Sequence, residues 1–148
     1  MPRTDNEKRI RSWFDAVNRG DTEAWVGCYT ADARSEDIAL KSVWRGTEEL
    51  DAGVREWISA MPDVHAEPEF LFADSESGFA QWTLSGTISG PIGGMPDEII
   101  ELAKGKSFSV RGATVYGFSA AGLVRHETLY WNLSDVLTQL GILPPMGT

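Results

Sequence analysis

The sequence has few of the residues that most often carry recognisable chemistry. It contains one cysteine, Cys28, and two histidines, His65 and His126. A single cysteine cannot form an internal disulfide, which is typical of a reducing compartment, so we expect a cytoplasmic protein. The two histidines lie far apart, and neither has a metal-ligand partner at the usual spacing. The sequence also lacks a phosphate-binding loop and a dinucleotide fingerprint, so we expect neither a metal nor a cofactor.

Clusters of basic residues and long apolar runs are missing too. The formal net charge is -9, and negative charge repels nucleic-acid phosphates and gives no attraction to anionic lipid surfaces. No apolar stretch approaches the ~20 residues that a membrane-spanning helix needs. The N-terminus has no apolar run after its charged residues, so we expect no signal peptide. Nucleic acid and membranes are therefore not expected partners.

Large aromatic side chains, in contrast, are plentiful. A chain of 148 residues has the length of one domain, and we expect residues 1–148 to form one. Six Trp and six Phe are more than the core of so short a chain needs. We therefore predict that some of them line a concave apolar site for a small hydrophobic ligand.

The first half of the chain shows helical periodicity. Thr4 and Glu7 have the spacing of a capping box, and the helix that follows ends at Gly20. A short helix is predicted over 21–29 and a third over 47–61, before Pro62. Residues 31–45 have no clean period and are expected to form a loop with a short strand.

The second half changes to a period of two, which indicates strands over 65–73, 79–89, 108–119 and 123–132, the first interrupted by Pro68. Residues 90–97 are rich in Gly and Pro and form either a hairpin loop or a mobile lid, and residues 97–104 form a helical turn. A final short helix is expected from Ser134 to Gly141. This order predicts an α+β fold in which three N-terminal helices pack on a strongly curved, mixed or antiparallel sheet, a cone-shaped barrel that encloses a pocket.

Three stretches have the order and spacing of a known family. They are Asn18-Arg-Gly-Asp21 with 29–37, Trp82–Gly90 with Gly94-Met-Pro96 and Gly105-Lys106, and Gly122–Trp131 with Gln139-Leu-Gly141. Together they resemble a SnoaL-like polyketide cyclase of the nuclear transport factor 2-like superfamily along nearly the whole chain. The resemblance implies the fold described above and a homodimer formed through the outer face of the sheet. The fold hosts many activities, so it does not by itself fix the function.

The front of the chain also resembles ketosteroid isomerase, which has the same fold. In that alignment Asp37 takes the position of the general base, whereas Trp13 and Thr114 replace the two donors of that family. In SnoaL-like cyclases an Asp after Tyr-Trp acts as acid and base, and here the position is Asn132. An amide cannot exchange a proton at neutral pH, so this departure from the family pattern bears on the mechanism.

Asp37 is the leading candidate for a general base, because an apolar pocket raises the pKa of a carboxylate toward neutrality. The alternative is a solvated loop residue beside Glu36. His126 is the candidate second acid/base, since its pKa suits proton transfer. If no bulge intervenes, His126 points inward and Glu127 outward. Asn132 either holds the substrate or caps the last helix.

Further residues are predicted to contact the substrate or form the wall around it: Trp13, Trp82, Thr114, Tyr116 and Tyr130. Each of the aromatic residues among them has core packing as its alternative. Asp63 resembles the second acidic residue of polyether epoxide hydrolases, with turn formation after Pro62 as the alternative.

The functional hypotheses belong to two classes. The first is a cofactor-independent cyclase or isomerase acting by acid/base chemistry on a small hydrophobic polyketide-type intermediate, with epoxide hydrolysis as a variant. The second is a non-catalytic module that binds a small molecule or assembles with partners. Paired titrating groups that converge on one pocket favour the first class.

Overall fold

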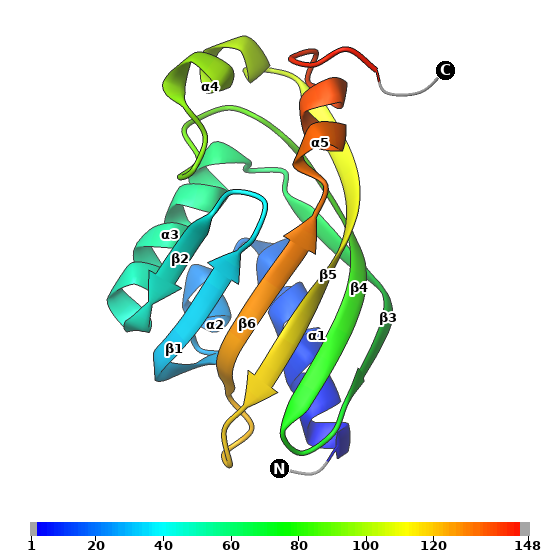
Figure 1. The fold of residues 1–148 in the computed structure, drawn as a ribbon. Coiled ribbons are helices and arrows are strands. Elements are labelled where there is room, and N and C mark those ends of the chain that lie inside the picture. Colours follow the sequence, from blue (N-terminus) through cyan, green and yellow to red (C-terminus); the bar gives the residue numbers. More distant parts are fainter. Residues whose placement is uncertain (1–2, 146–148) are drawn as a thin grey trace.

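The computed structural model describes residues 3–145, except for the side chains of residues 3 and 4. The capping side chain predicted at Thr4 therefore lies outside the described part. Eleven elements follow one another, as Figure 1 shows: α1 (Arg3–Arg19), α2 (Thr22–Val26), β1 (Tyr29–Asp37), β2 (Ser42–Arg45), α3 (Gly46–Ala60), β3 (His65–Ala73), β4 (Ser77–Thr87), α4 (Asp97–Ala103), β5 (Ser107–Phe118), β6 (Val124–Trp131) and α5 (Leu133–Gln139). The three N-terminal helices and the α+β class are confirmed.

The strands form one six-stranded sheet in the order β2-β1-β6-β5-β4-β3. Only β1 and β6 run parallel, and every other neighbouring pair is antiparallel, so the sheet is mixed. The long strands β3, β4 and β5 curve around the helical layer, and α4 and α5 lie at one end (Figure 1). The sheet does not close into a barrel, because β2 and β3 remain its two edges.

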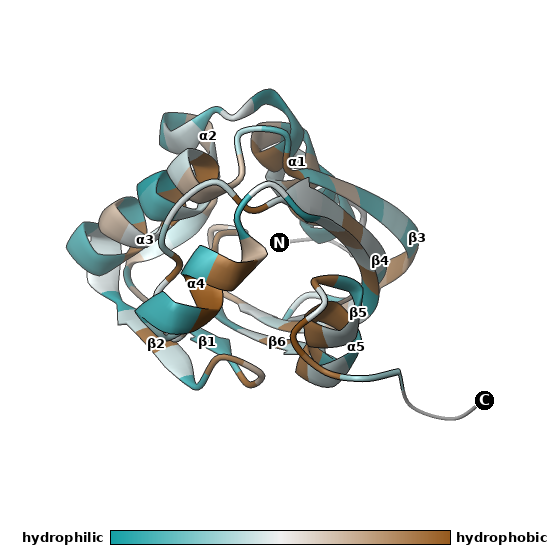
Figure 2. Cartoon of the chain, turned by 90° about the horizontal axis from the view of Figure 1, so that it is seen from above, coloured by the Kyte–Doolittle hydropathy of each residue, from teal (hydrophilic) through white to brown (hydrophobic). Residues whose placement is uncertain are grey.

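The inner face of the sheet follows the alternation read from the sequence. On β4, the side chains of Ala80, Trp82 and Leu84 are buried, and Ile88 after the strand is buried as well. Val110, Thr114, Tyr116 and Phe118 are buried on β5. Viewed from above, the sheet curves along two sides of the molecule, and the helices α1, α2 and α3 lie opposite it (Figure 2).

One stretch predicted as mostly loop is regular structure. Residues 29–37 form the nine-residue strand β1, and residues 42–45 form β2, which turns back beside it. The inward positions of β1 are Tyr29, Ala33, Ser35 and Asp37, and all four are buried. Because those after Tyr29 are small or polar, they give no hydrophobic alternation, and the period-two signal of a strand is lost.

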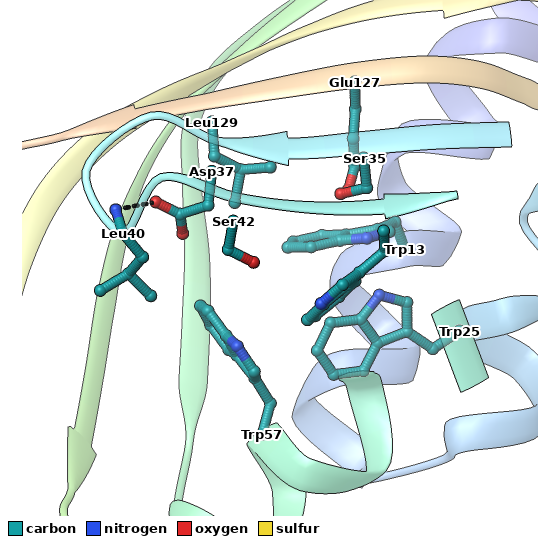
Figure 3. Close-up of a pocket in the computed structure, with 10 residues that line it drawn as sticks. Trp13, Trp25, Ser35, Asp37, Leu40, Ser42, Trp57, Glu127 and Leu129 are labelled. Carbon is teal, nitrogen blue, oxygen red and sulfur yellow. Dashed lines mark hydrogen bonds between the residues drawn. The ribbon is translucent and has the colours of Figure 1, made fainter. Parts of the chain in front are cut away.

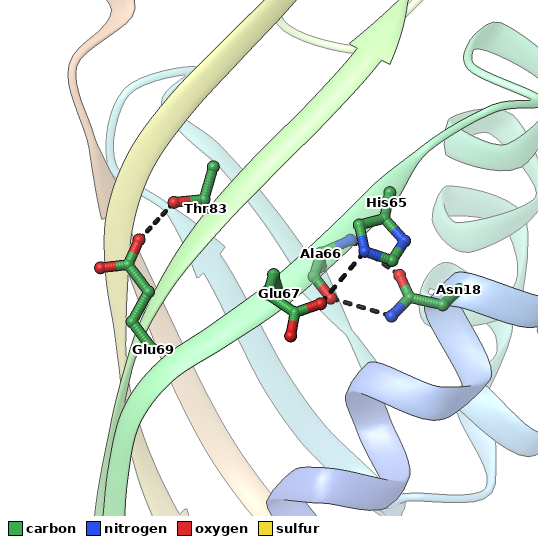
Figure 4. A network of polar contacts seen from close by, with 6 residues as sticks. All are labelled: Asn18, His65, Ala66, Glu67, Glu69 and Thr83. Atoms are coloured by element: carbon green, nitrogen blue, oxygen red, sulfur yellow. Dashed lines mark hydrogen bonds and ion pairs between the residues drawn. The ribbon is translucent and has the colours of Figure 1, made fainter.

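A side-chain amide fastens the first helix to the edge strand β3 (Figure 4). Asn18 Nδ2 donates to the carbonyl oxygen of Ala66 at 2.9 Å, and the Ala66 amide donates to Asn18 Oδ1 at 2.7 Å. Beyond Pro68 the strand has a bulge at Glu69, whose carboxylate accepts hydrogen bonds from Thr83 and from Gln81. Pro68 thus interrupts the ladder without ending the strand, as expected.

We predict that Asn18→Ala lowers the free energy of unfolding by about 1–2 kcal/mol, because both hydrogen bonds to β3 are lost. Urea unfolding followed by circular dichroism measures this difference. Ser12→Ala is the control, since Ser12 lies on the same helix and bonds only within it. An equal loss in both variants would contradict a specific role of the Asn18 pair.

Candidate functional site

A pocket lined by polar and aromatic groups lies between the inner sheet face and the helices (Figure 3). The space between its atoms, including open solvent at the mouth, measures about 390 Å³. Helices α1, α2 and α3 and strands β1, β2 and β6 all contribute side chains. The pocket is lined by Trp13, Trp25, Ser35, Asp37, Leu40, Ser42, Trp44, Trp57, Glu127 and Leu129.

Asp37 occupies the last position of β1 and faces this pocket, as predicted. Its side chain is 8% exposed. The carboxylate accepts a hydrogen bond from the Leu40 amide at 3.0 Å and from Trp131 Nε1, which is 3.0 Å from both oxygens. Burial raises the pKa of Asp37, while the hydrogen bonds from Leu40 and Trp131 oppose the rise because they favour the ionised form.

Glu127 is the second carboxyl group of the pocket, and it comes from β6. It is 3% exposed. Its Oε2 accepts hydrogen bonds from Tyr29 Oη at 2.8 Å and from Ser35 Oγ at 2.7 Å. Its Oε1 is buried and has no hydrogen-bond partner among the described residues. Burial raises the pKa of Glu127 to about 7, opposed by the hydrogen bonds from Ser35 and Tyr29 and assisted by the negative charge of Asp37.

A chain of hydrogen bonds fixes the orientation of the Glu127 carboxyl. Trp13 Nε1 donates to Tyr29 Oη at 2.8 Å, so the hydroxyl proton of Tyr29 is directed to Glu127. Burial also raises the pKa of Tyr29, which keeps the phenol neutral. Because Oε2 already receives two donors, the proton of a neutral Glu127 belongs on Oε1, the oxygen left without a protein partner.

A glycine in α3 makes room for one wall of the pocket. A Cβ atom at Gly53 would lie 2.2 Å from Cε2 of Trp44, so the indole of Trp44 rests directly on the helix backbone. Trp44 in turn meets Trp57 edge to face, with ring centroids 6.5 Å apart. Glycine costs a helix interior about 1 kcal/mol relative to alanine, and here it admits a large aromatic side chain.

A second, apolar pocket adjoins the first and shares Leu40 and Trp57 with it. Ile92 and Met95, from the glycine-rich segment before α4, form part of its wall, together with Trp131 from β6. Glu56 on α3 accepts a hydrogen bond from the Gly93 amide and holds this segment against the helix. The segment predicted as a hairpin loop or a lid therefore covers a pocket, and α4 follows it as the predicted helical turn.

The orientation predicted for the last strand is wrong. His126 is exposed and Glu127 is buried. The ladder between β5 and β6 shifts register, pairing Gly117 with His126 but Phe118 with Val124, so Arg125 is an extra, bulged residue. The bulge reverses the alternation after Val124 and turns His126 to the outer face, where its ring lies over Gly117.

The same reversal places Tyr130 and Asn132 away from the pocket. Tyr130 is 50% exposed. Asn132 is also exposed and caps α5, its Oδ1 accepting from the Asp135 amide at 3.2 Å, which is the alternative considered above. Neither side chain lines either of the two pockets.

The remaining predicted residues divide between wall, core and surface. Trp13 lines the first pocket, which contains Asp37 and Glu127 and is called the carboxylate pocket from here on. Trp82 donates from Nε1 to Thr114 Oγ1 at 2.8 Å, and both are buried in the core behind the pockets, as is Tyr116. Asp63 is on the surface, where it accepts from the Thr87 amide at 2.9 Å and from the Thr87 hydroxyl at 2.8 Å. These hydrogen bonds lower the pKa of Asp63, which opposes a role as a proton donor.

Sequence reasoning missed most of the pocket wall: Glu127, Ser35, Ser42, Trp25, Trp44 and Trp57. The signal for Glu127 was a lone acid among the apolar residues Val124, Leu129 and Trp131, but it required the bulge to be located. No Lys, Arg or His lines either pocket in the part of the chain that the structure describes. The same part contains no group of three His, Cys, Asp or Glu placed to hold a metal ion and no helix able to cross a membrane.

The fold and the pocket together define an open α+β cone with a buried carboxyl pair. Residues 10–127 match the sequence model of the SnoaL-like domain, so the chain belongs to the SnoaL-like family. The comparison with curated proteins gives no match.

Solved structures share the fold. TsrD from Streptomyces laurentii is 26% identical with a TM-score of 0.78, covering 97% of this chain and 99% of its own. A protein from Jannaschia sp. CCS1, provisionally named a SnoaL-like polyketide cyclase, is 21% identical with a TM-score of 0.78, covering 97% of this chain and 95% of its own. SalBIII, described as an epoxide hydrolase/cyclase-like enzyme in pyran ring formation of the polyether salinomycin, is 20% identical with a TM-score of 0.70, covering 88% of this chain and 92% of its own.

We predict that Glu127 makes stability depend on pH between about 4.5 and about 7. The folded state keeps this proton up to a higher pH than the unfolded chain, so the stabilisation is complete below pH 4.5 and is lost as pH rises through 7. Glu127→Gln removes this term. The free energy of unfolding of the variant relative to wild type should therefore rise by about 3 kcal/mol from pH ~4.5 to pH ~8.

Urea unfolding of both proteins at several pH values tests this effect. Glu36→Gln is the matched control, because Glu36 is a neighbouring carboxylate, on β1, whose side chain pairs with Arg34. A constant difference between wild type and Glu127→Gln across the range would show that Glu127 titrates normally.

Proposed function

We propose that this protein is a cofactor-independent cyclase or isomerase that acts on a small, hydrophobic, oxygenated intermediate of the polyketide type. The observation that carries the proposal is the pair of buried carboxyl groups in one pocket. Burial raises the pKa of both, and that of Glu127 reaches about 7, whereas at Asp37 the hydrogen bonds from Leu40 and Trp131 favour the anion and oppose the rise. Such a pair supplies a base and an acid at the same pH.

Each carboxyl has a defined role in this mechanism. Asp37 takes a proton from a carbon next to a substrate carbonyl. Glu127 donates its proton from Oε1 to the substrate oxygen on which negative charge develops, while Tyr29 and Ser35 stabilise the resulting carboxylate through Oε2. In an isomerisation, Asp37 returns its proton to a different carbon and Glu127 recovers its own, so both groups end as they began.

In a cyclisation Asp37 takes the same proton, but Glu127 keeps its own and only donates a hydrogen bond to the resulting enolate, whose carbon attacks a second carbonyl of the substrate. Glu127 then protonates the new alkoxide, and the two carboxyls exchange protons with solvent before the next turnover. The apolar second pocket, lined by Leu84, Ile88 and Phe108 among others, accommodates the hydrocarbon part of the substrate. His126 and Asn132 have no part in either reaction.

Epoxide opening is a second candidate, supported by the same carboxyl pair and by the fold shared with SalBIII. Glu127 would protonate the epoxide oxygen, and Asp37 would activate a hydroxyl group of the substrate or a water molecule. Glu127 thus takes the role of the second acidic residue that was predicted for Asp63. Asp63 lies at the surface, where it accepts a hydrogen bond from the Thr87 amide. Incorporation of heavy oxygen from labelled water distinguishes hydrolysis from the intramolecular reaction.

We expect Asp37→Asn and Glu127→Gln each to lower kcat by about 10²–10⁴ fold, the usual contribution of a positioned acid or base. Polyketide-type ketones in D2O provide the assay, since base catalysis exchanges the proton next to the carbonyl for deuterium, which NMR detects. His126→Gln is the control and should retain activity. Exchange that survives in Asp37→Asn would exclude Asp37 as the base.

The outer face of the sheet supports the proposed homodimer. Phe70, Phe72, Val115 and Tyr130 are exposed there by 57%, 46%, 42% and 50%. Strand pairing makes them neighbours, because Phe72 pairs with Phe79, which pairs with Val115. A contiguous exposed apolar patch of this kind is typical of a protein interface.

Val115→Glu should convert the dimer to a monomer, because a charge would be buried without a partner at the centre of this patch. Sedimentation velocity measures the change. Ala52→Glu adds the same charge on exposed α3 and should leave the dimer intact. A monomeric wild-type protein at micromolar concentration would contradict the proposal.

A further inference from the structure

Four tryptophans surround the carboxylate pocket, and each comes from a different element: Trp13 from α1, Trp25 from α2, Trp44 from β2 and Trp57 from α3. They form two edge-to-face pairs. Trp13 and Trp25 have ring centroids 5.6 Å apart, and Trp44 and Trp57 are 6.5 Å apart. Indoles can also line a site for an apolar molecule, but a cation gains an additional attraction from them, because the π face of tryptophan is electron-rich.

The charges in the pocket favour the same kind of ligand. Asp37 and Glu127 are both acidic, and no cationic side chain lines the pocket among the described residues. Glu127 is 3% exposed, and its Oε1 has no hydrogen-bond partner among them. A carboxylate or phosphate ligand would be repelled by this arrangement, whereas a cation would neutralise a buried negative charge.

We propose that this pocket binds an organic ammonium group, such as a quaternary or protonated tertiary amine, between the four tryptophans and the carboxylates of Asp37 and Glu127. The apolar remainder of the ligand extends past Leu40 and Trp57 into the second pocket, which is lined by hydrocarbon and aromatic side chains. This binding does not require turnover. It therefore stands independently of the acid/base function proposed above.

A matched pair of probes separates the charge from the shape. Choline and 3,3-dimethyl-1-butanol have the same outline, but a neutral carbon replaces the ammonium nitrogen in the second. Both molecules bury the same methyl groups, so hydrophobic burial contributes equally to their binding. The two probes therefore differ in the charge alone, which adds the attraction to the indoles and the carboxylates and the cost of dehydrating the ammonium group.

Isothermal titration calorimetry with the full chain at about pH 8 should show choline binding at least about tenfold more tightly than its neutral analogue. Glu127→Gln and Trp57→Leu should each remove most of this preference, with Trp57 chosen because it is only partly buried. Glu36→Gln is the control, since it removes one negative charge outside the pocket. Circular dichroism verifies that each variant is folded.

Three results would overturn the proposal: equal affinity for the two probes, an equal loss of choline binding in Glu36→Gln and Glu127→Gln, or no choline binding by folded wild-type protein at millimolar concentration. The second result would mean that choline responds only to net charge.

The pH dependence of binding separates this proposal from the acid/base function. The titratable groups near Glu127 are Asp37, Tyr29, Tyr116 and Cys28, and burial raises the pKa of each of the last three, so they remain neutral near pH 7. Ammonium binding needs the ionised form of Glu127, so affinity for choline should rise about tenfold from pH ~6 to pH ~8. Turnover of a neutral substrate needs the protonated form and should fall over the same range. Affinity for choline that is constant or falls would contradict the proposed site, whatever the result for turnover.

Discussion

The parallel pairing of β1 with β6 is the constraint on which the site depends. It joins the first strand of the chain to the last, with Ser35 opposite Glu127 and Asp37 opposite Leu129. Both carboxyl groups therefore lie on the inner face of neighbouring strands, two positions apart along the sheet. Every other neighbouring pair of strands is antiparallel. The parallel pairing brings Ser35 and Glu127, which are 92 positions apart in the sequence, into one pocket.

The helices supply the part of the pocket wall that the sheet does not. Strands β1 and β6 supply the acidic groups, while α1, α2 and α3 supply indoles that exclude water from them. Exclusion of water raises the pKa of Glu127, and the hydroxyls of Tyr29 and Ser35 limit the rise by stabilising the anion. Together these effects leave the pKa of Glu127 at about 7, which is higher than that of a solvated carboxyl group on the surface.

The sequence predicted the fold class and most elements, because the helices and the strands β4 and β5 bury regular apolar faces. It predicted Asp37 in the pocket through family resemblance, since the residues of β1 that face inward are too small and polar to mark a strand. It placed His126 inward on the condition that no bulge interrupts the last strand, and the bulge at Arg125 reverses that orientation. A bulge depends on pairing with another strand, so a period read along one segment cannot locate it. The four tryptophans were visible in the composition, but their convergence from four elements is a property of tertiary packing.

Gly53 shows that the pocket also depends on a residue that touches no ligand. The wall at Trp44 exists because position 53 of α3 has no side chain, and even a methyl group would collide with the indole. The shape of the cavity thus depends partly on the absence of a side chain at position 53, although Gly53 is not among the residues that line the pocket. A relative with alanine at this position must carry a different wall opposite its carboxylates, and hence accept ligands of a different outline, even where every residue facing the cavity is the same.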